Sequence, residues 1–245
     1  MCRVLGIVSK KPISPIYFFK DAKNSLIELS KYHCHGWGVA WYENNKLKVY
    51  KEPIAAYKSS NLEKIVKEIR SCLILAHIRR KSKKFRYNPC LEDTHPFFYQ
   101  KYCFVHNGDL PYRRRLLRIL YLKDTFRKEL KGHTGSEVIF YYFLQHYIKY
   151  GLKKLSVLFK LLKEIGEFRN LIFLFSDGKY LLGCKYIAKE EATAKIKHTL
   201  YIHINKDKII LSSIPFKELN PVEVKNKTLL RIDKDTLTVK KYELV

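Results

Sequence analysis

The stretch Met1-Cys2-Arg3-Val4-Leu5-Gly6-Ile7-Val8-Ser9 opens the chain and predicts a strand over residues 3–9. Most of its apolar residues are aliphatic or β-branched, which is typical of a strand. The segment contains no apolar run as long as that of a signal peptide. Cys2 therefore stands directly before an expected strand.

The rest of the chain predicts more strands, with helices between them. Helices are expected over 16–32, 61–70, 136–150 and 153–165, and single strands over 72–78 and 102–106. A hairpin is expected over 38–42 and 47–51, and three more over 171–175 with 180–186, 199–204 with 208–212, and 229–232 with 238–242. Many antiparallel strands around two internal helices predict a layered α+β fold.

The composition predicts one domain over residues 1–245. Hydrophobic residues make up 47% of the chain and aromatic residues 14%, which is enough to fill a sizeable core. No Pro/Gly/Ser-rich linker divides the sequence, and no apolar run approaches the ~18 residues that span a bilayer. We therefore expect a cytoplasmic protein that is not inserted in a membrane.

The charge is strongly positive. Lys and Arg number 48 against 23 Asp and Glu, a net charge of +25. Such a field can attract nucleic acid, but the charges are spread along the chain and are dense only over 79–84 and 113–115. A solvated basic surface is the simplest interpretation, so specific nucleic-acid binding is not expected. Attraction of anionic small molecules or of a protein partner stays open.

The cysteines do not predict a metal site. Six are present, without a CxxC pair. The triplet His33-Cys34-His35 contains ligand types, but neighbouring side chains on an extended segment point to opposite faces. No second ligand pair stands at zinc-site spacing. We expect no metal and no cofactor.

Cys2 is the first candidate catalytic residue. A small second residue permits removal of Met1, which would make Cys2 the new N-terminus. Its α-amino group would then have a pKa near ~8 and could act as a base toward the adjacent thiol. The position alone is weak support, because most cysteines at position 2 have no such role.

Two further segments supply groups that an amide-cleaving site needs. Arg79 follows the apolar segment 75–78, and an arginine there can hold a carboxylate through two charge-assisted hydrogen bonds. Asn107-Gly108 ends another expected strand and offers an amide NH2 and a backbone N–H, which suit an oxyanion hole. Alone, each has a simpler interpretation, a surface arginine and a turn.

Taken in order, several segments resemble the class II glutamine amidotransferases, which are N-terminal-nucleophile hydrolases, and in particular their stand-alone branch. The segments are Met1-Cys2-Arg3-Val4-Leu5-Gly6, His35-Gly36-Trp37-Gly38-Val39-Ala40-Trp41-Tyr42, Ala76-His77-Ile78-Arg79, Asn88 through Thr94-His95-Pro96-Phe97, and His106-Asn107-Gly108. Their order and rough spacing agree with the family over nearly the whole chain. The resemblance implies a four-layer αββα sandwich of two antiparallel sheets.

The resemblance also implies roles for single residues. Cys2 would attack the γ-amide of glutamine or of another γ-glutamyl compound, while Asn107 and Gly108 would stabilise the oxyanion. Arg79 would bind the substrate α-carboxylate. The pocket wall would be shaped by His95, Trp37 and Gly38.

One departure from the family pattern concerns Thr134-Gly135-Ser136-Glu137, which resembles a helix N-terminus. The family usually has aspartate at the position of Gly135, where it pairs with the substrate α-ammonium group. Ser136 and Glu137 complete this expected substrate-binding segment, and Glu137, Asp109 or Asp93 could replace the missing carboxylate.

Three functions remain open at this stage. The first is a glutaminase, either a plain hydrolase or one serving a separate ammonia-accepting synthase subunit. The second is a hydrolase of γ-glutamyl small molecules, favoured by the missing aspartate. The third is a binding or regulatory module that keeps the fold without turnover.

Overall fold

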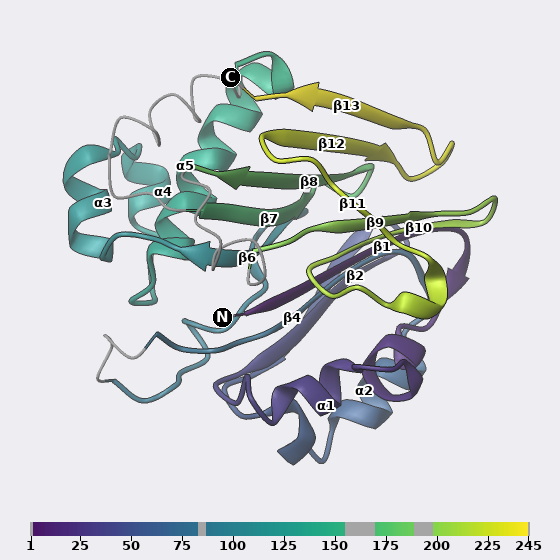
Figure 1. The fold of residues 1–245 in the computed structure, drawn as a ribbon. Coiled ribbons are helices and arrows are strands. Elements are labelled where there is room, and N and C mark those ends of the chain that lie inside the picture. Colours follow the sequence, from purple (N-terminus) through teal and green to yellow (C-terminus); the bar gives the residue numbers. More distant parts are fainter. Residues whose placement is uncertain (1, 83–86, 155–169, 189–197, 245) are drawn as a thin grey trace.

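The computed structural model describes residues 2–82, 87–154, 170–188 and 198–244. Two antiparallel sheets pack face to face, and helices cover both outer faces (Figure 1). The α+β class and the αββα sandwich are therefore confirmed.

Sheet A contains seven strands in the described part of the chain, in the order β11-β9-β10-β1-β4-β2-β3. Their bounds are β1 Arg3–Ile13, β2 Trp37–Glu43, β3 Lys46–Glu52, β4 Ser71–Ile78, β9 Tyr201–Ile204, β10 Lys208–Ser212 and β11 Val222–Glu223. β1 lies between β4 and β10, with Leu5 opposite both Ala76 and Ser212. The segment that follows Cys2 is thus a central strand.

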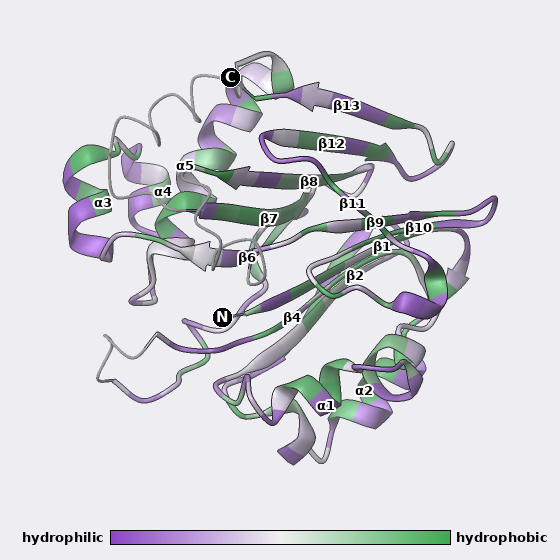
Figure 2. Ribbon diagram, viewed as in Figure 1, coloured by the Kyte–Doolittle hydropathy of each residue, from purple (hydrophilic) through white to green (hydrophobic). Residues whose placement is uncertain are grey.

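Sheet B contains six described strands, in the order β13-β12-β8-β7-β6-β5. Their bounds are β5 Phe97–Tyr99, β6 Tyr102–Asp109, β7 Asn170–Ser176, β8 Tyr180–Ile187, β12 Thr228–Asp233 and β13 Val239–Glu243. The central strand β7 is almost wholly hydrophobic, while β13 at the edge is largely hydrophilic (Figure 2). A strand that is buried on both faces needs apolar residues throughout, which explains the difference.

Two helical layers complete the sandwich. The helices α1 (Leu26–Ser30) and α2 (Leu62–Glu68) pack on sheet A. The helices α3 (Arg113–Ile119), α4 (Asp124–Arg127) and α5 (Gly135–Tyr150) pack on sheet B, on the opposite side of the molecule (Figure 1). Alternation along β1 joins the layers, because Leu5 and Ile7 face the helices of sheet A while Val4 and Val8 face sheet B.

Most of the expected elements are confirmed. All four hairpins form, as β2–β3, β7–β8, β9–β10 and β12–β13. The expected helix over 61–70, the strands over 72–78 and 102–106, and the helix over 136–150 appear as α2, β4, β6 and α5. Most of the helix expected over 153–165 lies outside the described residues.

The helix expected over 16–32 is wrong as a single element. A π-helical turn covers Tyr17–Asp21, and α1 begins only at Leu26. Between them, Asn24 has a φ of +63°, which a helix cannot contain, and the Ser25 side chain caps α1 by accepting the N–H of Glu28. The left-handed backbone of Asn24 and the capping hydrogen bond of Ser25 override the apolar periodicity.

Candidate active site

A cavity of about 80 Å³ lies where β1, β4 and β6 approach the beginning of α5. Six of the ten residues that the sequence predicted for the site line it: Cys2, Arg79, His95, Gly108, Gly135 and Ser136. These residues are spread over the sequence from Cys2 to Ser136. The pairing of the strands and the position of the α5 N-terminus bring them to one cavity.

Cys2 stands at the mouth of this cavity, half-buried, directly before β1. The pairing of Arg3 with Ile78 places Cys2 next to the end of β4. There the backbone N–H of Arg80 points to the Cys2 sulfur, with the nitrogen 3.4 Å from Sγ. The thiol therefore contacts the residue that follows Arg79, and both Cys2 and Arg79 line the cavity.

The Arg79 side chain is buried and forms an ion pair with one carboxylate. Its Nη2 lies 3.6 Å from Oδ2 of Asp93, which is fully buried, and its backbone N–H donates to the carbonyl of Gly36. Its Nη1 has no hydrogen-bond partner among the described residues. Because Arg79 also lines the cavity, the guanidinium can offer donors to a ligand carboxylate. The sequence named Asp93 only as a possible replacement for the carboxylate missing at Gly135, not as the partner of Arg79.

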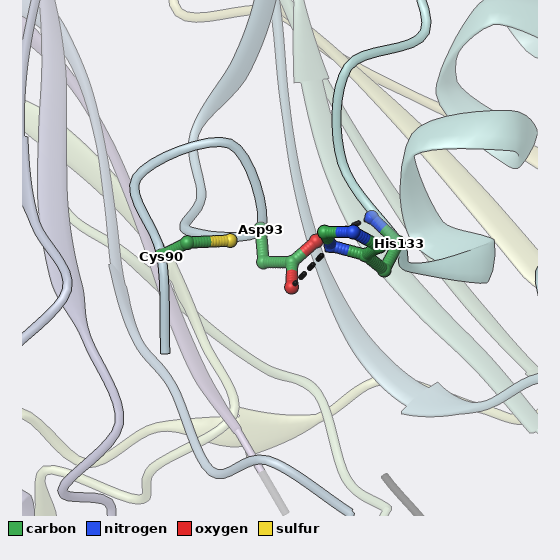
Figure 3. A group of neighbouring side chains, drawn as sticks. All are labelled: Cys90, Asp93 and His133. Carbon is green, nitrogen blue, oxygen red and sulfur yellow. Dashed lines mark hydrogen bonds and ion pairs between the residues drawn. The ribbon is translucent and has the colours of Figure 1, made fainter. Parts of the chain in front are cut away.

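Asp93 also belongs to a small cluster with Cys90 and His133, drawn in Figure 3. The backbone N–H of His133 donates to Asp93 Oδ1 at 2.6 Å, and the His133 Nδ1 lies 3.5 Å from Oδ2. Potential ligand atoms of the three residues lie within 4.8 Å of one another, so they could hold a metal ion. A cation there would compete with the Arg79 guanidinium for the same carboxylate.

Two buried histidines, His95 and His106, line the cavity, and a third, His77, packs against His95. The His95 ring stacks on that of His77 with centroids 4.1 Å apart, and the His77 Nε2–H donates to the His106 carbonyl. The His106 Nδ1 shares a hydrogen bond with the Ser136 hydroxyl at 3.0 Å. Burial lowers the pKa of His77 and of His106 to about 3 and lowers the pKa of His95 well below its ordinary value. The imidazoles are therefore neutral in the folded protein near neutral pH.

Because these histidines are neutral in the folded protein, we expect the free energy of unfolding to decrease at acid pH. An unfolded histidine titrates near ~6.5, so between about pH 3 and pH 6.5 the unfolded chain binds more protons than the folded one. Stability that is present above this window is lost as the pH falls through it. For His77 and His106 we expect a loss of about 2 kcal/mol each between about pH 7.5 and about pH 5, measured as the free energy of unfolding in urea. His106→Gln should lose about 2 kcal/mol less than the wild type, and an equal loss would contradict this account.

Asn107 and Gly108 lie side by side near the end of β6. The Asn107 side chain is fully buried, and neither its amide nitrogen nor its oxygen has a hydrogen-bond partner among the described residues. A Cβ on Gly108 would lie 2.5 Å from the Asn170 carbonyl oxygen and 2.6 Å from the His106 Nε2, so no side chain fits there. A buried amide without a partner is costly, and Asn107 itself is not among the described residues that line the cavity.

Gly135 leaves no space for the carboxylate that the family usually has at this position. A Cβ there would lie 2.9 Å from the Pro111 carbonyl oxygen and 2.9 Å from Leu116 Cδ1. The nearby Glu137 does not line the cavity, because its carboxylate accepts the backbone N–H groups of Lys131 and Gly132. Burial raises the pKa of Glu137. The described lining of the cavity contains no acidic residue.

Trp37 and Gly38 lie outside the cavity lining. The Trp37 ring is buried in the core between sheet A and its helices, and its Nε1–H donates to Glu52 at 3.0 Å. The expectation that this ring shapes the pocket wall is therefore corrected. Gly38 affects the cavity only through His95. Its backbone packs so closely against the His95 carbonyl and Pro96 that a Cβ would clash with both.

Sequence reasoning did not identify His77 or His106 as parts of the site, and it named Asp93 only as a possible counter-charge for the substrate α-ammonium group. A signal was present for His106, since it directly precedes Asn107 in the matched segment. Asp93 stands two positions before His95, but its pairing with Arg79 depends on the path of the loop between β4 and β5.

A sandwich of two antiparallel sheets, with a cysteine directly before a central strand, is the fold that the sequence resemblance implied. The chain belongs to the class-II glutamine amidotransferases, whose family model matches residues 1–204.

Relatives of known sequence support this membership. The uncharacterized protein MJ1515 of Methanocaldococcus jannaschii is 30% identical over 199 residues, which are 76% of this chain and 51% of that protein. The "Putative glutamine amidotransferase YafJ" of Escherichia coli is 28% identical over 201 residues, covering 74% of this chain and 72% of its own. A Haemophilus influenzae relative with a similar name is 26% identical over 194 residues, 74% of this chain and 62% of its own. The chain thus spans about half of MJ1515.

Solved structures agree on the fold. A glutamine aminotransferase class-II domain protein of Silicibacter pomeroyi superimposes with a TM-score of 0.73, at 21% identity and with full coverage of both chains. The glutamine phosphoribosylpyrophosphate amidotransferase of Bacillus subtilis gives a TM-score of 0.60 at 18% identity, covering 99% of this chain and 49% of its own. Among the described residues, no helix has the length and apolar composition that crossing a membrane requires.

Proposed function

We propose that this protein hydrolyses the γ-amide of glutamine, with Cys2 as the nucleophile after removal of Met1. The observation that carries the proposal is the shared cavity of Cys2, Arg79 and Gly108. A thiol, a carboxylate-binding guanidinium and an oxyanion-hole backbone then surround one small ligand.

The proposed reaction proceeds in two halves. The Cys2 thiol gives its proton to the α-amino group of the same residue, and the sulfur attacks the amide carbon. The oxyanion accepts hydrogen bonds from the Asn107 amide and the Gly108 N–H. As the C–N bond breaks, the α-ammonium returns the proton to the leaving nitrogen, which departs as ammonia. Water, activated by the same amine, then attacks the thioester and releases glutamate and the thiol.

Arg79 orients the substrate in this proposal. Its guanidinium binds the substrate α-carboxylate, and Asp93 is a positioning residue that holds the guanidinium from behind. His95 lines the cavity as a neutral, buried ring and excludes water from the reacting amide.

A second candidate substrate class is a γ-glutamyl small molecule other than glutamine. The observation that favours it is Gly135, whose missing carboxylate cannot be replaced in place because Pro111 and Leu116 fill the position. An α-ammonium group left without a counter-charge in a closed site costs a few kcal/mol. Binding energy from a larger leaving group could offset that cost.

A substrate panel separates these candidates. The purified protein should release product from at least one of glutamine, γ-glutamyl dipeptides and N-acetylglutamine, measured as ammonia or free amine. Higher kcat/KM for γ-glutamyl dipeptides than for glutamine would support the second class, whereas equal or better turnover of glutamine would reject it. No turnover of any substrate by protein that has lost Met1 would contradict the proposed hydrolase and favour a binding module.

The proposed chemistry also suggests a partner subunit and a cellular compartment. Ammonia released by a class II domain is ordinarily consumed elsewhere, so a separate synthase subunit is a proposed partner. Free cysteines fit a reducing compartment, and all six are free here, which supports a cytoplasmic location.

A further inference from the structure

A second, larger hollow lies next to the catalytic cavity, along α3. It has a volume of about 700 Å³ and is lined by Tyr87, Tyr112, His133 and four arginines of α3, which are Arg113, Arg114, Arg115 and Arg118. We call it the arginine groove. In Figure 1 the helix α3 stands at the outer edge of the helical layer over sheet B.

The arginine groove has a strongly positive charge that no carboxylate of its described lining balances. Its described lining contains no carboxylate, and no described carboxylate forms an ion pair with Arg114 or Arg118. The Arg113 Nε is buried and has no hydrogen-bond partner among the described residues. Like charges three and four positions apart destabilise a helix. The four arginines on the seven residues of α3 therefore repel one another, and a bound anion would remove this destabilisation.

The lining chemistry defines the anion. Guanidinium groups match phosphate oxygens with paired hydrogen bonds, and tyrosine rings offer faces on which an aromatic base can stack. The volume lies within the range of about 300–1,000 Å³ that is typical of small-molecule sites. A concave site of this size fits one compact ligand better than it fits the extended backbone of a nucleic acid.

We propose that the arginine groove binds a nucleoside di- or triphosphate. The phosphates contact the arginines of α3, and the base stacks against Tyr112 at the rim, where this side chain is 53% exposed. The groove adjoins the catalytic cavity through consecutive residues, since Pro111 lines the cavity and Tyr112 the groove, and His133 lines the groove and Thr134 the cavity. The ligand therefore lies beside the amide-cleaving site without filling it.

Calorimetric titration with ATP, ADP and inorganic tripolyphosphate at one fixed salt concentration tests the proposal. The double variant Arg114→Gln/Arg118→Gln should weaken ATP binding by about tenfold or more. The matched control Lys64→Gln/Lys67→Gln removes two exposed charges from α2 and should leave the affinity unchanged. Tyr112→Ala should weaken ATP binding and leave tripolyphosphate binding as it is.

Three results would overturn the proposal. The first is an absence of saturable ATP binding by the wild-type protein. The second is an equal loss in the control variant, which would show a general response to the net charge. The third is displacement of ATP by a single-stranded oligonucleotide that itself binds more tightly, which would make the surface a nucleic-acid site. Circular dichroism of each variant verifies that the fold is retained.

Discussion

Cys2→Ala is expected to lower kcat for amide hydrolysis by about 10³-fold or more. The substitution removes the sulfur that forms the thioester and leaves the α-amino group, Arg79 and Gly108 in place. The reaction would then depend on direct attack by water in the same cavity, which is far slower. The measurement is ammonia release at saturating substrate, with Cys34→Ala as the matched control, because Cys34 is exposed and does not line the cavity.

The Cys34→Ala control separates the loss of the nucleophile from a general effect of removing a cysteine. Cys34→Ala should keep the wild-type rate, since its thiol contacts only His35 among the described side chains. A Cys2→Ala enzyme that keeps more than about a tenth of the wild-type kcat would contradict the assignment of Cys2 as nucleophile.

Asn107→Ala is expected to lower kcat by about 10²- to 10³-fold with little change in KM. Among the described residues the Asn107 amide has no hydrogen-bond partner, and we propose that it gains one only when the oxyanion forms. Loss of an interaction made only in the transition state lowers kcat and kcat/KM equally. Steady-state kinetics on a variant whose urea unfolding is still cooperative provides the measurement. A raised KM with unchanged kcat would show instead that Asn107 binds the ground state.

The sandwich could be predicted largely from local patterns. The apolar residues of β1 and the turn residues of the four hairpins point to the same antiparallel arrangement, and each hairpin depends only on neighbouring sequence. The helix predicted over 16–32 is interrupted because the positive φ of Asn24 and the Ser25 cap are local features that the apolar periodicity does not encode. The helix α3 was not predicted, because its arginines mask the spacing of the two buried residues Leu116 and Leu120.

The site was predictable only where residues belong to recognisable segments. Cys2 and Arg79 could be named from the sequence, but their proximity results from the pairing of β1 with β4. The partner of Arg79 could not be named, because Asp93 reaches it through a loop whose path no local pattern encodes. Gly135 could be recognised from the sequence as a departure from the family pattern. That Pro111 and Leu116 leave no room for a side chain there depends on packing, which the sequence pattern does not show.

The central claim is that Cys2 is an N-terminal nucleophile beside an oxyanion hole. Intact-mass spectrometry of the purified protein, with and without excess 6-diazo-5-oxo-norleucine, tests it most directly. The account predicts a mass lacking Met1 and one covalent adduct, located on Cys2 by peptide mapping and absent from Cys2→Ala. A protein that retains Met1 and gains no adduct, or that gains its adduct on another cysteine, would contradict the account.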